Sequence, residues 1–315
     1  MTYKNKAFLR RCGLIIISAI LIFCCISMVA TKIIYDAIFI RFDGEYSIPA
    51  ELMNMVESRE AFEYQSGDST LSGYLYRSDA QSPQDALVVI APGFAAGADS
   101  YLWQIKSLTD MGWSVFAFDV TGCYSSDGES TVGFSQEIFD LKATISYIEN
   151  SNKFGYNDIV IIGHSRGGYA ACCSLNSDFE IAAVVSVGGV NSAMEGIMSA
   201  SVDMIGPIAY GNYGFLWFYQ ATLFGADTVG LSAHKEIEKS NLPVLIIHGA
   251  EDEKIPLDKY SIFSYKDDIK SESAEFILWD EPNHSGHTNL LFDPDGRANA
   301  ELMKAINDFL IKSIY

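Results

Sequence analysis

The chain has 315 residues, which is long enough for one large α/β domain or two small ones. Hydrophobic residues make up 49% of it, which excludes a disordered chain, and the formal net charge of -19 argues against nucleic-acid binding. The six cysteines show no spacing typical of a zinc site, so no metal or cofactor is predicted.

The N-terminus predicts a membrane anchor. Residues 1–11 form a basic tail with four Lys or Arg and no acid, and residues 12–30 carry no charge, a length that suits a membrane-spanning helix. We assign the anchor to residues 12–34, with the tail in the cytoplasm and the folded domain outside the cell membrane. A cleaved signal peptide is the alternative, but Met28 stands where cleavage after Ala30 would favour a small residue.

After a linker at residues 35–58, alternating strand and helix patterns predict one domain over residues 59–315. Two strands joined by a turn come first, at 60–64 and 71–76. Six apolar strands follow, at 86–91, 114–118, 158–162, 181–187, 243–248 and 274–279. Helices are predicted at 100–111, 136–149, 257–265 and 298–313, and after the strand at 158–162. Unbroken apolar strands that alternate with helices are typical of a parallel sheet covered on both faces.

The pentapeptide G-H-S-R-G at residues 163–167 stands between the strand at 158–162 and a helix. A serine on such a sharp strand-to-helix turn is typical of a nucleophile elbow, which projects the hydroxyl above the sheet. Gly163 and Gly167 occupy positions where a Cβ would crowd the turn. A plain helix N-cap is the alternative role for Ser165, and the flanking strand and helix favour the nucleophile.

An insert at residues 190–242 interrupts the alternation of strands and helices. It is far longer than most connections of this kind and is rich in aromatic residues. We expect it to form a helical cap over the serine, with a pair of core-packing helices as the alternative.

From these features, residues 60–313 resemble the α/β-hydrolase superfamily. In that family the nucleophile, the acid and the histidine follow one another along the chain, each on a loop after a strand. The resemblance implies that Ser165 is the nucleophile. The segment from His248 to Pro256 is similar to the family pattern H-G-x-x-D-x-x-x-P, which implies Asp252 as the acid. Glu251 and Glu253 are the alternatives.

The histidine that completes the triad is chosen by its spacing from the last strand. Four residues separate the end of that strand from His284, as is usual in the family, so the resemblance implies His284 as the base and leaves His287 as the alternative. We expect His164 to point away from the serine hydroxyl, His248 to act as a support and His234 to lie in the cap.

The resemblance also implies an oxyanion hole made by the backbone N–H groups of Phe94 and Arg166. Phe94 lies in the segment Pro92-Gly93-Phe94, where the family commonly has His-Gly-x, so proline replaces histidine here. The loop at residues 119–128 is similar to a further landmark, D-x-x-G-x-x-x-S, to which we assign a structural role. A disulfide between Cys123 and a cysteine at 172–173 is geometrically open but has no support in the sequence.

The sequence therefore predicts a mostly parallel, doubly wound sheet of α/β-hydrolase type with a helical cap. The predicted activity is hydrolysis of a carboxylic ester through an acyl-enzyme, on a small-molecule or lipid-like substrate. Alternatives are a peptidase or amidase, an acyltransferase, or a binding protein with a blocked pocket. A further hypothesis is that residues 215–224 enter the outer leaflet and draw the substrate from lipid.

Overall fold

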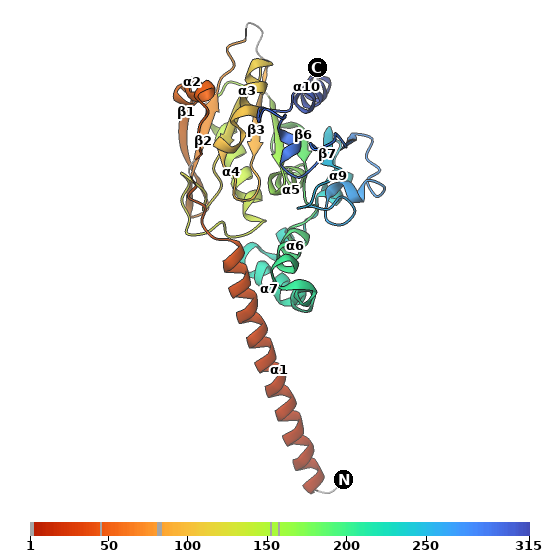
Figure 1. Cartoon of the computed structure of the whole chain (residues 1–315). Coiled ribbons are helices and arrows are strands. Elements are labelled where there is room, and N and C mark those ends of the chain that lie inside the picture. The colour runs from red at the N-terminus through yellow and green to blue at the C-terminus, as the bar shows by residue number, and fades with distance from the viewer. Residues whose placement is uncertain (1–2, 45, 81–83, 152, 157) are drawn as a thin grey trace.

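The computed structural model describes residues 3–44, 46–80, 84–151, 153–156 and 158–315. A long N-terminal helix leads into a domain in which helices cover both faces of one sheet (Figure 1). The first two residues of the predicted basic tail lie outside the described residues.

One eight-stranded sheet forms the centre of the domain, in the order β1-β2-β4-β3-β5-β6-β7-β8. β1 and β2 form an antiparallel hairpin, β2 pairs antiparallel with β4, and the remaining neighbours are parallel. The strands are β1 (Glu60–Ser66), β2 (Ser69–Tyr76), β3 (Ala86–Ala91), β4 (Ser114–Phe118), β5 (Asp158–His164), β6 (Ile181–Val187), β7 (Val244–Gly249) and β8 (Ala274–Trp279). This mostly parallel sheet confirms the predicted fold class. Strands that are covered on both faces need unbroken apolar runs, which is why the sequence indicated them.

The helices pack into two apolar cores, one on each face of the sheet. The α-helices are α1 (Tyr3–Ile38), α2 (Met53–Ser58), α3 (Leu102–Asp110), α4 (Gln136–Asn150), α5 (Arg166–Cys173), α6 (Ala193–Ile205), α7 (Tyr213–Phe224), α8 (Ala226–Val229), α9 (Ala233–Lys239) and α10 (Ala300–Ile314). Short 3-10 helices are η1 (Ala50–Leu52), η2 (Ala98–Tyr101), η3 (Gly206–Asn212), η4 (Ile262–Tyr265) and η5 (Asn289–Leu291).

The helix predicted over residues 257–265 is wrong. Only η4 forms there, because the backbone of Ser261 pairs with Val190 in a β-bridge and cannot continue a helix from residue 257. The loop thereby ties the start of the insert to the segment that follows β7.

The N-terminal helix docks on the domain instead of leading into a free linker. α1 extends through residues 35–38, beyond the predicted end of the anchor, and Tyr35 and Phe39 are buried in the apolar core. By length and composition, Arg10–Ile38 can cross a membrane.

The long insert forms two structures. α6, η3 and α7 (residues 193–224, the cap) extend from the domain beside the part of α1 that joins it (Figure 1). α9 packs against α5 in the core, where Ala233 and Ile237 are buried. The thiols of Cys123, Cys172 and Cys173 are free and buried.

Candidate active site

Ser165 occupies a strained turn between β5 and α5. Its φ of 55° and ψ of -117° lie outside the regions that most residues adopt. A Cβ on Gly163 would collide with the backbone of Gly167, and one on Gly167 would collide with Ala91, so both positions require glycine. The turn raises the serine hydroxyl above the carboxyl end of the sheet, as the pentapeptide predicted.

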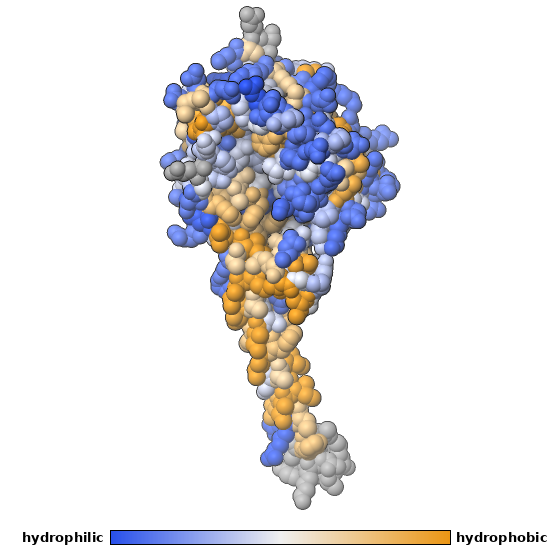
Figure 2. All heavy atoms as spheres, viewed as in Figure 1, coloured by the Kyte–Doolittle hydropathy of each residue, from blue (hydrophilic) through white to orange (hydrophobic). Residues whose placement is uncertain are grey.

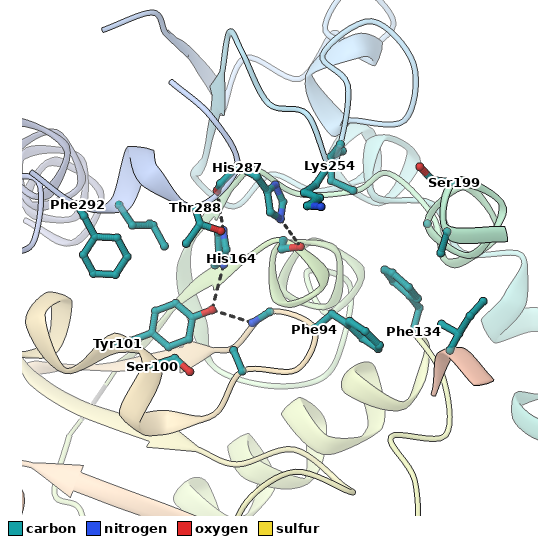
Figure 3. Close-up of a pocket in the computed structure, with 18 of the residues that line it drawn as sticks. Phe94, Ser100, Tyr101, Phe134, His164, Ser199, Lys254, His287, Thr288 and Phe292 are labelled. Carbon is teal, nitrogen blue, oxygen red and sulfur yellow. Dashed lines mark hydrogen bonds between the residues drawn. The ribbon is translucent and has the colours of Figure 1, made fainter. Parts of the chain in front are cut away.

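A hydrogen-bonded series runs from Ser165 through His287 to Asp252. His287 Nε2 lies 2.9 Å from Ser165 Oγ (Figure 3). His287 Nδ1 lies 2.7 Å from Asp252 Oδ2. Because a carboxylate only accepts, Nδ1 carries the ring proton and Nε2 is left to accept from the serine hydroxyl. The three side chains therefore have the geometry of nucleophile, base and orienting acid.

Asp252 is held as a carboxylate by several donors. Its Oδ1 accepts from the backbone N–H groups of Lys254, at 2.9 Å, and Ile255, at 2.8 Å. Burial on its own would raise the pKa of Asp252, but the hydrogen bond and charge of His287, with the Ile255 N–H, outweigh it and leave that pKa below its ordinary value.

The alternative acids support the histidine loop. Glu251 accepts from the hydroxyl of Ser285 at 2.9 Å, and Glu253 accepts from the backbone N–H of His287 at 3.5 Å. Asp252 is therefore the acid that the structure brings to the histidine ring, as the H-G-x-x-D spacing predicted.

The choice of His284 as the base is wrong in this structure. His284 lies in a turn in which its N–H donates to Glu281 O at 3.0 Å and Asn283 has a φ of 64°. Its Nδ1 lies 2.9 Å from Phe292 O, away from Ser165. Because the chain turns back at His284, the loop reaches Ser165 only three residues later, at His287. The turn-forming pair Pro282-Asn283 was the available signal in the sequence.

His164 and Tyr101 connect the loop after β3 to the loop that carries His287. The Gly93 N–H donates to Tyr101 Oη at 2.8 Å, Tyr101 Oη lies 3.0 Å from His164 Nδ1, and His164 Nε2 lies 3.1 Å from His287 O (Figure 3). A carbonyl only accepts, so Nε2 donates and Nδ1 accepts from the tyrosine. Burial, together with the neighbouring His287 ring, lowers the pKa of His164 to about 3, so the His164 ring is neutral.

This relay was only partly predicted. His164 points away from the serine hydroxyl, as expected, but its contacts and the role of Tyr101 were missed. Pro92, which replaces the family's histidine, was the signal that support for this loop had to come from elsewhere in the chain.

The two predicted oxyanion donors lie beside the serine. Arg166 is the first residue of α5, and the first N–H groups of a helix have no intrahelical acceptor. Among the described residues, the Phe94 N–H donates to no protein group. The Arg166 side chain is fully buried, forms an ion pair with Glu137 and lies 5.6 Å from the Phe94 ring. The Arg166 side chain thus packs against Phe94, the residue that carries the other candidate donor.

Comparison with known proteins shows which proteins share this fold. Residues 82–204 match the model of a family described as serine aminopeptidase, S33. An esterase from Pyrococcus furiosus superposes with a TM-score of 0.65 at 18% sequence identity, over 88% of this chain and 99% of that one. By its fold, the chain is an α/β hydrolase.

Further solved structures resemble this α/β hydrolase. An enzyme from Butyrivibrio proteoclasticus, solved with ferulic acid bound, matches with a TM-score of 0.60 and 18% identity over 81% of this chain and 99% of that one. An acylaminoacyl peptidase from Pyrococcus horikoshii matches with a TM-score of 0.59 and 16% identity, over 81% of this chain and 41% of that one. No curated protein matches the chain. These findings support a serine hydrolase.

Two other predicted roles are confirmed in this α/β hydrolase. Asp119, in the D-x-x-G-x-x-x-S loop, is structural: its carboxylate accepts from the N–H groups of Ala98, at 2.9 Å, and Ser125, at 3.2 Å. His248 supports the acid loop, since its Nε2 donates to Ile255 O at 2.9 Å. Burial raises the pKa of Asp119 to about 6 and lowers that of His248.

A cavity of about 660 Å³ lies in front of Ser165. This volume is within the range of small-molecule sites. Its walls are largely apolar and come from several elements (Figure 3), among them Phe94, Phe134, Ala200, Leu291 and Phe292. The pocket in front of Ser165 is therefore open, whereas a non-catalytic binding protein would be expected to have a blocked one.

Proposed function

We propose that this α/β hydrolase cleaves a carboxylic ester through an acyl-enzyme formed on Ser165. The observation that carries the proposal is the buried series Ser165–His287–Asp252, with distances of 2.9 and 2.7 Å. A serine hydroxyl is a weak nucleophile until a neighbouring base accepts its proton, and this series supplies the base in hydrogen-bond contact.

In the first half of the reaction, His287 Nε2 takes the proton as Ser165 Oγ attacks the ester carbonyl. The imidazolium then gives that proton to the leaving alkoxide, and the C–O bond to the alcohol breaks. In the second half, a water attacks the acyl-enzyme with His287 again as the base, and the acid is released. Asp252 holds the ring in the required tautomer and stabilises its positive charge.

The Phe94 and Arg166 N–H groups would stabilise the oxyanion of each tetrahedral intermediate. Loss of one such donor typically costs about 10²- to 10³-fold in kcat. Neither donor needs a metal or a cofactor.

We infer that α1 is retained as the anchor of the enzyme in the cell membrane, with the domain outside. Cleavage after Ala30 would remove Ser27, which is buried, and Phe23, whose ring lies 6.0 Å from that of Phe215 in the cap. Because Tyr35 and Phe39 also pack into the core, the enzyme should be tested as the full chain. An N-terminal tag that remains on the active protein in membranes would support retention, and its release would contradict it.

Labelling by a fluorophosphonate probe tests the nucleophile. The wild type is expected to be labelled and Ser165→Ala to be unlabelled. Ser313→Ala, which changes a serine near the end of α10 that does not line the cavity, serves as the control and should keep its label. Equal labelling of wild type and Ser165→Ala would exclude Ser165 as the nucleophile.

Cleavage of an amide is the second candidate, favoured by the match of residues 82–204 to a family described as serine aminopeptidase. The same residues would act, with an amine as the leaving group. A panel of esters and aminoacyl amides, with Ser165→Ala as the blank, separates the two: ester turnover alone supports the esterase, and amide turnover at a comparable rate supports the peptidase.

A further inference from the structure

The cap exposes an uncharged segment that a water-soluble surface would not carry. Residues 204–226 contain no Asp, Glu, Lys or Arg. Several large apolar side chains in this segment are exposed: Met204, Ile205, Ile208, Tyr210, Tyr213, Trp217, Phe218 and Leu223. Ile208 is 76% exposed and Phe218 is 56% exposed. Figure 2 shows that the hydrophobic residues of α1 continue onto the end of the domain that adjoins this helix. Such a patch marks a site of contact with a partner or a membrane.

α7 is apolar on almost every side, unlike a helix in water. Leu216, Gln220 and Phe224 face inwards, and the outward side carries Trp217, Phe218 and Leu223. The Gln220 amide contacts Met194 Sδ of α6 at 2.8 Å. A helix on a water-soluble protein turns its polar face outwards, so the surroundings that suit α7 are apolar.

The contact between the cap and α1 has the composition of a membrane helix pair. α1 turns Ser27 and Thr31 towards the protein and leaves Ile26, Val29 and Ile33 exposed. The Asn212 amide, between η3 and α7, donates to Thr31 Oγ1. Small residues and interhelical hydrogen bonds at the contact, with large apolar residues outside, are typical of helix packing in lipid.

The position of the cap along α1 gives its depth. The Phe215 ring lies 6.0 Å from Phe23, and the Tyr219 ring lies 5.0 Å from Tyr35. Phe23 comes nine residues before Lys32, the first charge after the apolar span. At about 1.5 Å per residue, Phe23, against which Phe215 packs, lies about 13 Å deeper along the helix than Lys32. If α1 spans the bilayer, the cap reaches that depth into the leaflet on the side of the domain.

The cavity extends from the serine towards this surface. One face of α6 lines it through Gly196, Ser199, Ala200 and Asp203, and the uncharged segment begins at the next residue. Ile38, at the end of α1, lines the cavity as well. An acyl chain that entered between α1 and α6 would pass Asp203 and then reach the serine along small and apolar side chains.

We propose that the cap is seated in the leaflet on the domain's side and that the enzyme draws its ester substrate, a membrane lipid, directly from that leaflet. The substrate part of this proposal rests on the hydrolase activity proposed above. The occupant of the apolar face is the lipid into which α1 inserts, because α1 and the cap form one continuous surface.

The seat of the cap is tested by tryptophan fluorescence of the full chain, without turnover. The protein is reconstituted in vesicles of phosphatidylcholine brominated at the middle of its acyl chains, with unbrominated vesicles as the reference. Trp217 lies in the cap and the other three tryptophans, Trp103, Trp113 and Trp279, lie in the domain. Bromine should quench the wild type, Trp217→Phe should lose most of this quenching, and Trp279→Phe should keep it. Equal quenching of wild type and Trp217→Phe would overturn the proposal.

The source of the substrate is tested by comparing two esters. Dioleoylglycerol in phosphatidylcholine vesicles is the lipid substrate, and p-nitrophenyl butyrate is the soluble one. The double variant Trp217→Ser/Phe218→Ser should turn over the lipid ester roughly tenfold more slowly, because two large apolar contacts with lipid are lost, with the soluble ester unchanged. Leu278→Ser/Ile311→Ser, which changes exposed apolar residues on the domain, should leave both rates unchanged.

The outcomes separate the two proposals. A lipid-ester rate that stays normal in the cap variant overturns the lipid route. A wild type that cleaves neither ester and takes no fluorophosphonate label overturns the proposed function and, with it, the substrate part of the inference. The quenching result decides the seat of the cap in either case.

Discussion

The α/β domain and the α1–cap unit differ in the side chains that they expose. In the domain, the central strands bury Val and Ile, and the ion pair of Glu137 and Arg166 is buried as well. In the α1–cap unit, Thr31 and Gln220 face inwards beside apolar side chains, and large apolar residues also cover the outward faces. This difference is the basis of the proposal that water surrounds the domain and lipid surrounds the cap, with the cavity between them.

The largest expected effect tests the buried ion pair of the domain. Glu137→Gln leaves the Arg166 guanidinium buried without its counter-charge, so the free energy of unfolding should fall by about 3–5 kcal/mol. Glu60→Gln, which breaks an exposed pair with Arg77, should cost less than about 1 kcal/mol. Chemical unfolding of the two variants in mild detergent measures both, and equal losses would show that the pair is not shielded from water as described.

The second prediction tests whether the two surfaces face different solvents. Phe218 and Leu278 are 56% and 43% exposed, so exposure alone predicts similar tolerance of a charge. A lysine in lipid costs up to about 2.5–3.5 kcal/mol near the centre of a bilayer, so Phe218→Lys should destabilise the protein in lipid nanodiscs. Leu278→Lys should change stability by about 0.5 kcal/mol or less. Thermal unfolding that is equal for the two variants would remove the contrast between the surfaces.

The third prediction concerns the buried hydrogen-bond relay from Gly93 through Tyr101 to His164. Tyr101→Phe removes the hydroxyl that joins Gly93 to His164, which leaves both without that partner. We expect kcat on a soluble ester to fall about tenfold with KM little changed, because the loop that carries Phe94 loses its support. Tyr64→Phe removes another buried tyrosine hydroxyl, which pairs Tyr64 on β1 with Thr144 on α4, and should leave kcat unchanged. A rise in KM with kcat unchanged would argue against a role in positioning.

The fourth prediction is a pH dependence of stability. The pKa of His164 is about 3 in the folded chain against an ordinary value of 6.5, so the unfolded chain binds the proton more readily between these values. The free energy of unfolding should therefore fall as the pH drops from about 6.5 towards 3. His164→Gln retains a neutral donor and acceptor and should show a weaker decline, while His248 contributes in the same sense in both proteins. Identical pH profiles for the two proteins would contradict a buried neutral His164.

Strands could be predicted well because burial on both faces writes a continuous apolar run. The bounds of β3, β4 and β6 agree with their predicted ranges for this reason, and those of β8, a partly exposed edge strand, agree as well. The helix at residues 257–265 failed because a long-range contact, the bridge from Ser261 to Val190, overrides local helix propensity.

The site was predicted where a local motif determines the geometry. Ser165 follows from its pentapeptide, and Asp252 from the spacing after β7. The base was misassigned because the loop after β8 spends three residues on a turn, which only the folded backbone reveals. The docking of Tyr35 and Phe39 was missed because they lie in the segment predicted as a linker, and their burial comes from contacts with distant parts of the chain.

Ester turnover by His287→Ala and His284→Ala tests the account most directly. The two histidines lie three residues apart on one loop, and only His287 contacts both Ser165 and Asp252. The account predicts that His287→Ala lowers kcat on a soluble p-nitrophenyl ester by about 10²- to 10⁴-fold, while His284→Ala retains most of the wild-type rate. The reverse order, with His284→Ala inactive and His287→Ala active, would contradict it.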